Sequence, residues 1–282
     1  MHGAQPLRVT DLALSRRLER AEGEGNAAFV EARASLDPGP GYTWCEVAGT
    51  YAMFDGVASP LTQSFGLGLF APATSADLDT IESFFTSRGA DVNHEVSPLA
   101  DAALLALLPA RGYRPVELTT VMHRALAPDS PPSPHAAGSG APSTRRVGGE
   151  EVMTWAEASA RGWGEAPELA EFMRDFGRVT GRSRGTTCFV AELDGAVVAT
   201  GALVMHGGVA LLAGASTIPA WRGRGAQTAL LAARLTYAAE QGCDLAMMAA
   251  APGSTSQTNA ERQGFRIAYT RTKWHRPAAA GA

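Results

Sequence analysis

The chain is organised around the stretch Thr217-Ile-Pro-Ala-Trp-Arg-Gly-Arg-Gly-Ala-Gln-Thr-Ala-Leu-Leu231. The apolar run before it, Val209–Ala213, predicts a buried strand. Apolar residues recur at helical spacing after it and predict a helix that stops at Gly242. Gly223 and Gly225 allow the backbone of the intervening loop to approach a ligand closely. Because the first amides of a helix have no internal partner and carry the positive end of its dipole, this stretch predicts an anion site.

The two arginines of the loop favour phosphate as the anion. Arg222 and Arg224 supply donors and charge that suit a phosphate group. No Gly-Lys-Ser/Thr follows the glycines, and no Gly-x-Gly-x-x-Gly opens the helix, so neither a P-loop nor a dinucleotide fingerprint is indicated. A solvated basic turn between strand and helix is the simplest alternative.

The segment Arg222-Gly-Arg-Gly-Ala-Gln227, preceded by Pro219-Ala-Trp221, resembles the pyrophosphate loop of the GNAT-type N-acetyltransferase superfamily. The family pattern is Arg/Gln-x-x-Gly-x-Gly/Ala. Gln227 departs from it, since Gly or Ala is expected there; its backbone amide can still donate, and its side chain is expected to turn outward.

The resemblance implies acetyl-CoA as co-substrate and no metal. The pantetheine arm is expected to lie between the strand that ends at Thr217 and a facing strand at Asp244–Ala251. The residues expected to bind the coenzyme are Ala215, Ser216, Thr217, Arg222, Gly223, Arg224, Gly225, Ala226, Gln227, Thr228 and Ser254.

The composition is that of a soluble globular protein. Of its 282 residues 45% are apolar and 18% are charged, which is enough apolar sequence for two ordinary domains. A net charge of -4 disfavours nucleic acid as a partner. Neither a membrane span nor a signal peptide is evident. Three scattered cysteines predict buried thiols in a reducing compartment, so we expect a cytoplasmic protein.

The chain divides at a Pro/Ser/Gly/Ala-rich linker into two halves that look like repeats. The predicted division is residues 1–126, the linker 127–144, and 145–282. Residues 111–124 align without a gap with residues 263–276, so that Gly112 matches Gly264 and Tyr113 matches Phe265. Each half therefore predicts a helix, a glycine stop, an apolar strand, a short helix, a Gly-aromatic step and a last strand.

The repeat breaks at the Arg/Gly loop. The first half has Ala73-Thr-Ser-Ala-Asp77 at that place, in which Thr74 or Ser75 predicts an N-cap and Asp77 would repel a phosphate. We therefore expect a degenerate GNAT-like domain followed by an acetyl-CoA-binding GNAT domain.

The second half predicts the GNAT order of elements. A strand is expected near residues 145–152, helices at 152–162 and 167–181, and strands at 187–193 and 197–205 joined by an Asp194-Gly195 hairpin turn. We therefore expect an α/β fold of the α+β type with a mixed sheet, built from two tandem GNAT-like domains of which the first is degenerate.

The catalytic acid and base are not assigned by the sequence. The family's tyrosine acid lies four residues before the Gly-Phe pair, where this chain has Ala260. Ser254, Ser256 or Asn259 could substitute, although Ser254-Thr-Ser-Gln257 also predicts a capping box. Glu192, His206 and His275 are not taken as catalytic.

The predicted function is direct transfer of an acetyl group from acetyl-CoA to a small-molecule or peptide amine. The alternative is a non-catalytic acyl-CoA sensor or scaffold, which the missing tyrosine keeps open. The tandem layout is similar in architecture to mycothiol synthase, without a motif for that substrate. Almost all basic residues are Arg, which hints at a GC-rich bacterial genome. The oligomeric state is left open, with a homodimer as one alternative.

Overall fold

The structure is a computed structural model that describes residues 10–126, 140–164 and 169–278. Residues 127–139, most of the expected linker, lie outside the described residues, as do the first two residues of the helix expected at 167–181.

The first half of the chain contains, in order, α1 (Leu12–Leu36), β1 (Thr43–Val47), β2 (Thr50–Phe54), β3 (Gln63–Phe65), α2 (Ser75–Thr86), β4 (Val92–Val96), α3 (Leu104–Ala110) and β5 (Arg114–Ala125). The second half contains β6 (Ser143–Arg146), η1 (Gly149–Glu151), α4 (Val152–Arg161), α5 (Ala170–Thr180), β7 (Thr186–Leu193), β8 (Ala196–His206), β9 (Val209–Thr217), η3 (Pro219–Trp221), α6 (Ala226–Glu240), β10 (Leu245–Ala250), α7 (Thr255–Arg262) and β11 (Arg266–Arg276). The strand expected at 145–152 is shorter than predicted, because Gly148 and Gly149 lead the chain into η1.

The repeat predicted from the sequence is confirmed in three dimensions. In each half a helix (α2 or α6) is followed by a strand, a short helix and a last strand. Gly89 and Gly242 end the two longer helices with φ of 71° and 84°, and Gly112 and Gly264 end the two short ones with φ of 85° and 82°. Left-handed residues at these four positions explain why glycine recurs in both copies.

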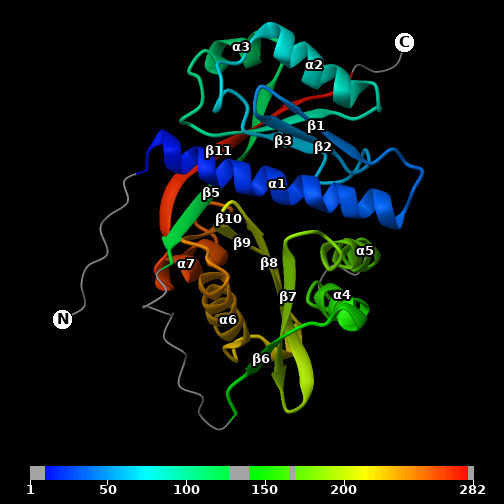
Figure 1. The fold of residues 1–282 in the computed structure, drawn as a ribbon, viewed down its shortest axis with the longest axis vertical. Helices are drawn as coiled ribbons and strands as arrows, with labels where there is room; N and C mark the ends of the chain where they lie inside the picture. Colours follow the sequence, from blue (N-terminus) through cyan, green and yellow to red (C-terminus); the bar gives the residue numbers. More distant parts are fainter. Residues whose placement is uncertain (1–9, 127–139, 165–168, 279–282) are drawn as a thin grey trace, which may run out of the picture.

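The halves exchange their last strands within one mixed sheet. The strand order is β1-β2-β3-β4-β11-β5-β10-β9-β8-β7-β6. Strand β5, from the first half, pairs with β10, and β11, from the second half, pairs with β4. The two exchanged strands also pair with each other along the segments that align in sequence. Figure 1 shows β11, in red, running into the half that the blue and cyan elements form.

Helices cover both faces of the sheet, and side chains alternate between them. On β7, Phe189 and Ala191 join the buried cluster beneath α6, whereas Cys188 and Val190 pack with Trp155 of α4. Helix α1 crosses the sheet on the same face as α4 and α5 and contacts strands of both halves (Figure 1). This alternation is the period of two that a strand buried on both faces requires.

A buried charge cluster joins α1 to the exchanged strand. Arg271 of β11 forms ion pairs with Glu22 at 2.7 Å and Glu95 at 2.9 Å, and lies 3.4 Å from Glu19. Tyr269 donates a 2.8 Å hydrogen bond to Glu19. One guanidinium therefore faces three carboxylates. Burial raises the pKa of Glu19 to about 7, although the positive charge of Arg271 acts in the opposite direction and lowers it.

We expect Glu19→Gln to stabilise the protein at pH 8 but not at pH 5. An unfolded glutamate has a pKa of about 4.3, so between that value and 7 the folded protein binds more protons than the unfolded chain. Glu19 therefore lowers the free energy of unfolding as the pH rises through this window. Gln cannot titrate and so avoids this loss of stability, which reaches about 4 kcal/mol at pH 8. Urea unfolding at both pH values measures the difference, and an equal effect at pH 5 and pH 8 would contradict it.

The cysteines are unpaired thiols. Cys188 and Cys243 are buried as expected, whereas Cys45 is only half-buried because it lies on β1 at the edge of the sheet. Among the described residues, no helix has the length and apolar character needed to cross a bilayer.

Candidate active site

Strands β9 and β10, at the centre of the second half, are paired over only part of their length, and we call the unpaired part the splay. They pair in parallel only through Leu245–Val209, Ala246–Ala210 and Met247–Leu211. Beyond these pairs Gly214 and Ala215 of β9 are exposed. A splayed pair of parallel strands leaves backbone donors and acceptors available to a ligand.

The Arg/Gly loop follows β9 and η3 and leads directly into α6. Gly223 and Gly225 have φ of 77° and 80°, and no heavy atom lies within 4 Å of where a Cβ would stand on either. The two glycines are therefore explained by left-handed backbone and not by crowding. Gly225 is the N-cap of α6 and provides no side-chain cap, and the loop from Arg222 to Gly225 is exposed. The start of α6 consequently faces solvent as an anion site would.

The loop arginines have different surroundings. Arg222 donates to the carbonyl oxygens of Thr217, at 3.3 Å, and Gly162, at 3.1 Å, and so ties the end of α4 to the loop. Arg224 lies over the ring of Trp221, 4.8 Å from its centre, and is exposed. Stacking on the indole holds the Arg224 guanidinium at the surface of the loop.

The expectation that Gln227 turns outward is wrong. Its side-chain amide donates to the carbonyl of Ser216 at 2.7 Å and to Thr217 Oγ1 at 3.0 Å. The hydroxyl of Ser216 in turn donates to the carbonyl of Ser159 and is buried. An amide side chain at this position satisfies strand carbonyls that Gly or Ala could not reach.

Helix α7 carries the residues considered for proton transfer. Ser254 accepts a 3.2 Å hydrogen bond from the backbone N–H of Gln257, so its predicted role as N-cap is confirmed. The Gln257 side chain accepts from the amide of Gly253 and not from that of Ser254, so the reciprocal bond of the predicted capping box is made one residue earlier. Ser256 and Asn259 are exposed. Ala260 is 1% exposed and lies in the buried cluster with Phe265 and Leu230. A tyrosine at position 260 would have to displace core side chains.

Three further side chains, Glu192, His275 and His206, lie near side chains outside the Arg/Gly loop. Glu192 pairs with Arg145 at 2.9 Å, and His275 contacts the side-chain oxygen of Asn93 at 3.0 Å. His206 is largely buried, 3.8 Å from Glu24. None of the three lies on the splayed segments of β9 and β10 or on the Arg/Gly loop.

The corresponding region of the first half is closed by its own chain. After β3 the backbone turns through Gly66–Phe70, where Leu67 and Leu69 are 1% and 2% exposed. The amide of Asp101 donates to the carbonyl of Gly68 at 2.8 Å. Thr74 and Asp77 form a capping box at the start of α2, and the hydrogen bonds from Thr74 lower the pKa of Asp77. A carboxylate thus stands where the second half has its open helix start.

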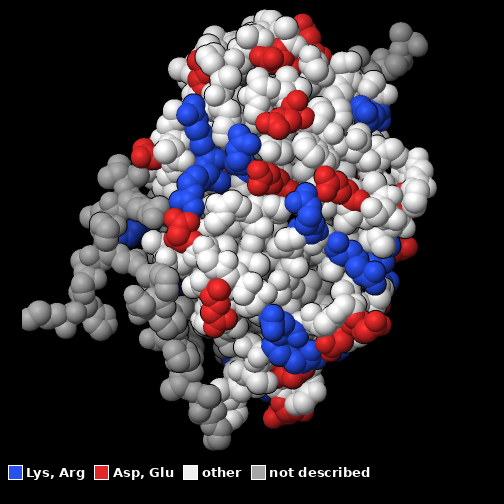
Figure 2. Space-filling view, in the orientation of Figure 1, with Lys and Arg blue, Asp and Glu red and all other residues white. Residues whose placement is uncertain are grey.

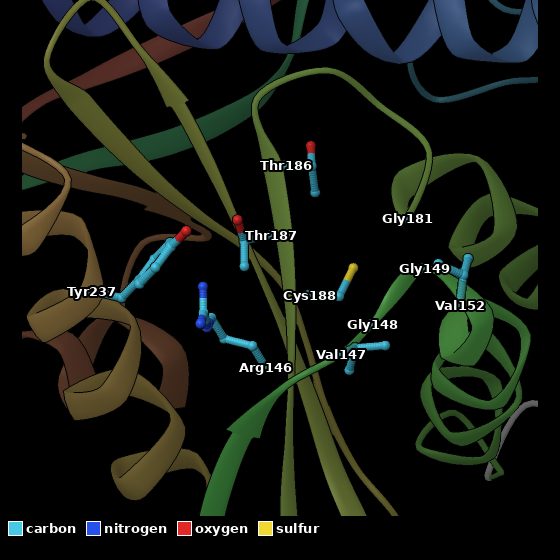
Figure 3. Close-up of a pocket in the computed structure, with 10 residues that line it drawn as sticks. All are labelled: Arg146, Val147, Gly148, Gly149, Val152, Gly181, Thr186, Thr187, Cys188 and Tyr237. Atoms are coloured by element: carbon cyan, nitrogen blue, oxygen red, sulfur yellow. The ribbon is translucent and has the colours of Figure 1, made fainter.

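A separate cavity of about 460 Å³ lies at the outer edge of β7, where β6 leaves it. Figure 3 shows Tyr237 and Arg146 on one side of β7 and Gly149 and Val152 on the other. Its lining contains none of the residues expected to bind the coenzyme.

On the face that carries α1, basic and acidic side chains are interspersed (Figure 2).

The sequence analysis did not predict a role for two buried residues near the splay. Arg234 of α6 and Gly201 of β8 lie against each other beneath β9. Both left a signal: Arg234 is a charged residue four positions after Leu230 in an apolar helical stripe, and Gly201 interrupts a strand.

Comparison with known proteins places the second half in a family. Residues 149–265 match the acetyltransferase (GNAT) family, so this part of the chain is a GNAT domain. No curated protein matches the chain.

Solved structures share the fold of the whole chain. A GCN5-related N-acetyltransferase from Kribbella flavida has a TM-score of 0.63 at 19% identity and covers 95% of this chain and 96% of its own. A GCN5-related N-acetyltransferase from Sphaerobacter thermophilus has a TM-score of 0.59 at 19% identity, with 98% and 96% covered. A tandem GNAT protein from the clavulanic acid biosynthesis pathway has a TM-score of 0.58 at 15% identity, with 98% of each chain covered. The chain therefore has a tandem GNAT fold, with the family match confined to its second half.

Proposed function

We propose that the chain is an N-acetyltransferase that transfers an acetyl group from acetyl-CoA to an amine, and that residues 145–282 form its catalytic domain. The proposal rests on one observation: β9 stops pairing with β10 after Leu211, becomes exposed at Gly214 and Ala215, and leads to a left-handed glycine loop and an uncapped helix. Residues 1–126 form a second GNAT-like domain in this proposal, without a coenzyme site of their own.

The residues of the second half fit the parts of acetyl-CoA. The amides of Ala226, Gln227 and Thr228 begin α6 and would bind the pyrophosphate together with Gly223 and Gly225. Arg224, held at the surface by Trp221, supplies positive charge beside them. Arg222 contributes by fixing the loop to α4, since its guanidinium already binds two carbonyls.

The splay fits the pantetheine arm. The exposed segment Gly214–Ala215 offers backbone groups, while the Ser216 side chain is used within the protein. Ser254 caps α7, which follows β10 in the chain. In the transfer, the amine nitrogen attacks the thioester carbon, a C–N bond forms, the C–S bond breaks, and its electron pair remains on sulfur. The proton lost by the amine passes to water or to a base that is not assigned.

One acetyl-CoA should bind per chain. In the first half the corresponding place is filled by Leu67 and Leu69, and Asp77 occupies the helix start. Titration calorimetry with acetyl-CoA measures the stoichiometry. Two equivalent sites would show that the first half has kept a coenzyme site.

A panel of amines with thiol release as readout separates the two candidate functions. The enzyme is expected to release CoA thiol with at least one amine. The sensor alternative is favoured by the burial of Ala260, which leaves the family's acid position without a donor. Tight binding of acetyl-CoA with no turnover across small amines, amino acids and peptide N-termini would decide for the sensor.

A further inference from the structure

Strand β9 contains a bulge at Gly214 and Ala215, three residues beyond its last pair with β10 at Leu211. Thr200 pairs with Ser216 and Ala202 with Ala213, so a single residue of β8, Gly201, lies opposite two residues of β9. The first of these two, Gly214, has φ of 58°. A left-handed glycine at the first position defines a common type of bulge, which bends the strand and redirects its backbone groups.

Two side chains of α6 hold the carbonyl groups on either side of this bulge. Arg234 Nη1 donates to the carbonyl oxygens of Ala202 at 3.0 Å and Ala213 at 3.2 Å, and Arg234 Nε donates to that of Leu230 at 3.2 Å. Gln227, two helical turns earlier, holds the carbonyl of Ser216 at 2.7 Å. The same face of α6 thus supports the bulge at both ends.

Gly201 makes room for the guanidinium. A Cβ on Gly201 would lie 2.9 Å from Arg234 Cζ, closer than side chains tolerate. The glycine in β8 and the arginine in α6 therefore form one arrangement.

The direction of the Ala213 carbonyl fixes the next amide. In a planar trans peptide the C=O and N–H bonds point in opposite directions. Since the Ala213 carbonyl points to Arg234 beneath the sheet, the N–H of Gly214 points away from α6. A cation bound to the carbonyl end of a peptide also polarises its N–H and strengthens it as a donor.

The charge of Arg234 has no counter-ion among the described residues. Its side chain lies 3% exposed between α6 and the sheet, and its bonded partners are neutral carbonyls. Burial lowers the pKa of Arg234 to about 10, so the group stays charged at neutral pH. A buried and uncompensated cation creates a strong positive field, because the low dielectric around it screens little.

We propose that Arg234 is a positioning residue for acyl transfer, an inference that rests on the function proposed above. It orients the Gly214 N–H toward the thioester, and its field stabilises the negative charge that develops on the thioester oxygen and then on the departing sulfur. Arg234 keeps its protons throughout; the C–S electron pair stays on sulfur as thiolate. A fixed cation of this kind lowers the need for the proton donor that Ala260 cannot provide.

The test is the pKa of the CoA thiol when CoA is bound to the protein, followed by ultraviolet absorbance of the thiolate. Free CoA titrated in the same buffer gives the reference value; a cysteine thiol in a peptide has a pKa of about 8.5. In the wild type we expect the pKa of bound CoA to be lower by about one unit or more, as a nearby positive charge requires. Arg234→Met should return it to the free value or above, and Arg234→Lys should keep most of the decrease.

Arg146→Met is the matched control, because it makes the same substitution beside the same helix, where the exposed Arg146 lies over the Tyr237 ring of α6 at 5.0 Å, without touching the bulge. It should leave the pKa of bound CoA at the wild-type value. A merely structural role for Arg234 predicts equal pKa values in the wild type and in folded Arg234→Met, and this result would overturn the inference. If Arg234→Met does not fold, Arg234→Gln, which is neutral but keeps a donor, provides the same comparison.

The outcomes separate this inference from the proposed function. If CoA does not bind to the wild type, the proposed function itself fails. If CoA binds to both proteins and its thiol titrates identically, only the role of Arg234 fails. With an accepted amine, Arg234→Met should lower kcat roughly tenfold or more and change KM for acetyl-CoA by less than about threefold, since the effect concerns the transition state.

Discussion

A Gly225→Asp variant should fold normally and bind acetyl-CoA at least about 100-fold more weakly than the wild type. Gly225 has φ of 80°, a conformation that Asp adopts more readily than most residues, and no heavy atom lies near its absent Cβ. The new carboxylate would stand at the positive end of α6, repel the pyrophosphate and compete for the same amides. Calorimetry with acetyl-CoA measures the affinity, and the thermal unfolding midpoint checks the fold.

Gly242→Asp is the control for that experiment. Gly242 lies just beyond the other end of α6, has φ of 84° and is equally free of neighbours. It adds the same side chain to the same helix far from the loop, so acetyl-CoA affinity should be unchanged. An unaltered affinity in folded Gly225→Asp would place the coenzyme elsewhere, and an equal loss in both variants would point to a general effect on α6.

The fold elements were predictable where their signals are local. The Asp194-Gly195 turn between two alternating runs predicted the β7–β8 hairpin, and both residues have positive φ. Gly112 and Gly264 marked the same step in each repeat because left-handed backbone favours glycine wherever it occurs. The Arg222–Gly225 loop lies between strand and helix as its composition indicated.

The strand exchange was not predictable in the same way. Strands β5 and β11 carry nearly the same pattern of apolar and polar residues. This alternation indicates which face of each strand is buried, but it does not indicate which strand each one pairs with. What fixes β11 in the first half is a set of contacts distant in sequence, such as the pair of Arg271 with Glu22. Tertiary contacts of this kind override local preference.

The candidate site also contains residues that the sequence predicts and residues whose role appears only in the folded protein. Loop residues follow from local backbone requirements, whereas Gln227 and Arg234 act across the sheet on carbonyls of β8 and β9. Their roles depend on a bulge that arises only when β8 and β9 are paired. The position that carries the family's tyrosine is Ala260, which is buried in the core beneath α7 and brings no proton donor to the site.

The buried cluster around Arg271 gives the largest expected loss of stability. Arg271→Met should lower the free energy of unfolding at pH 8 by about 3–5 kcal/mol, the usual cost of leaving buried charges without their partner. The variant removes the guanidinium that binds Glu22 at 2.7 Å and Glu95 at 2.9 Å and lies 3.4 Å from Glu19, and it leaves Glu95 only the ammonium of Lys273 at 3.3 Å. Since these contacts hold β11 against α1 and β4, urea unfolding followed by circular dichroism measures how strongly the exchanged strand is held.

Lys273→Met, two residues further along β11, is the matched control. Lys273 pairs with the exposed Glu117 at 2.7 Å and with Glu95 at 3.3 Å, so its loss should be only about 1 kcal/mol. The pH dependence separates lost charge from lost packing. Without Arg271 the buried carboxylates bind protons more readily in the folded state than in the unfolded chain, so the deficit of Arg271→Met should shrink as the pH falls from 8 to 5. A deficit that is the same at both pH values, or no larger than that of Lys273→Met, would mean that packing alone holds β11 in the first half.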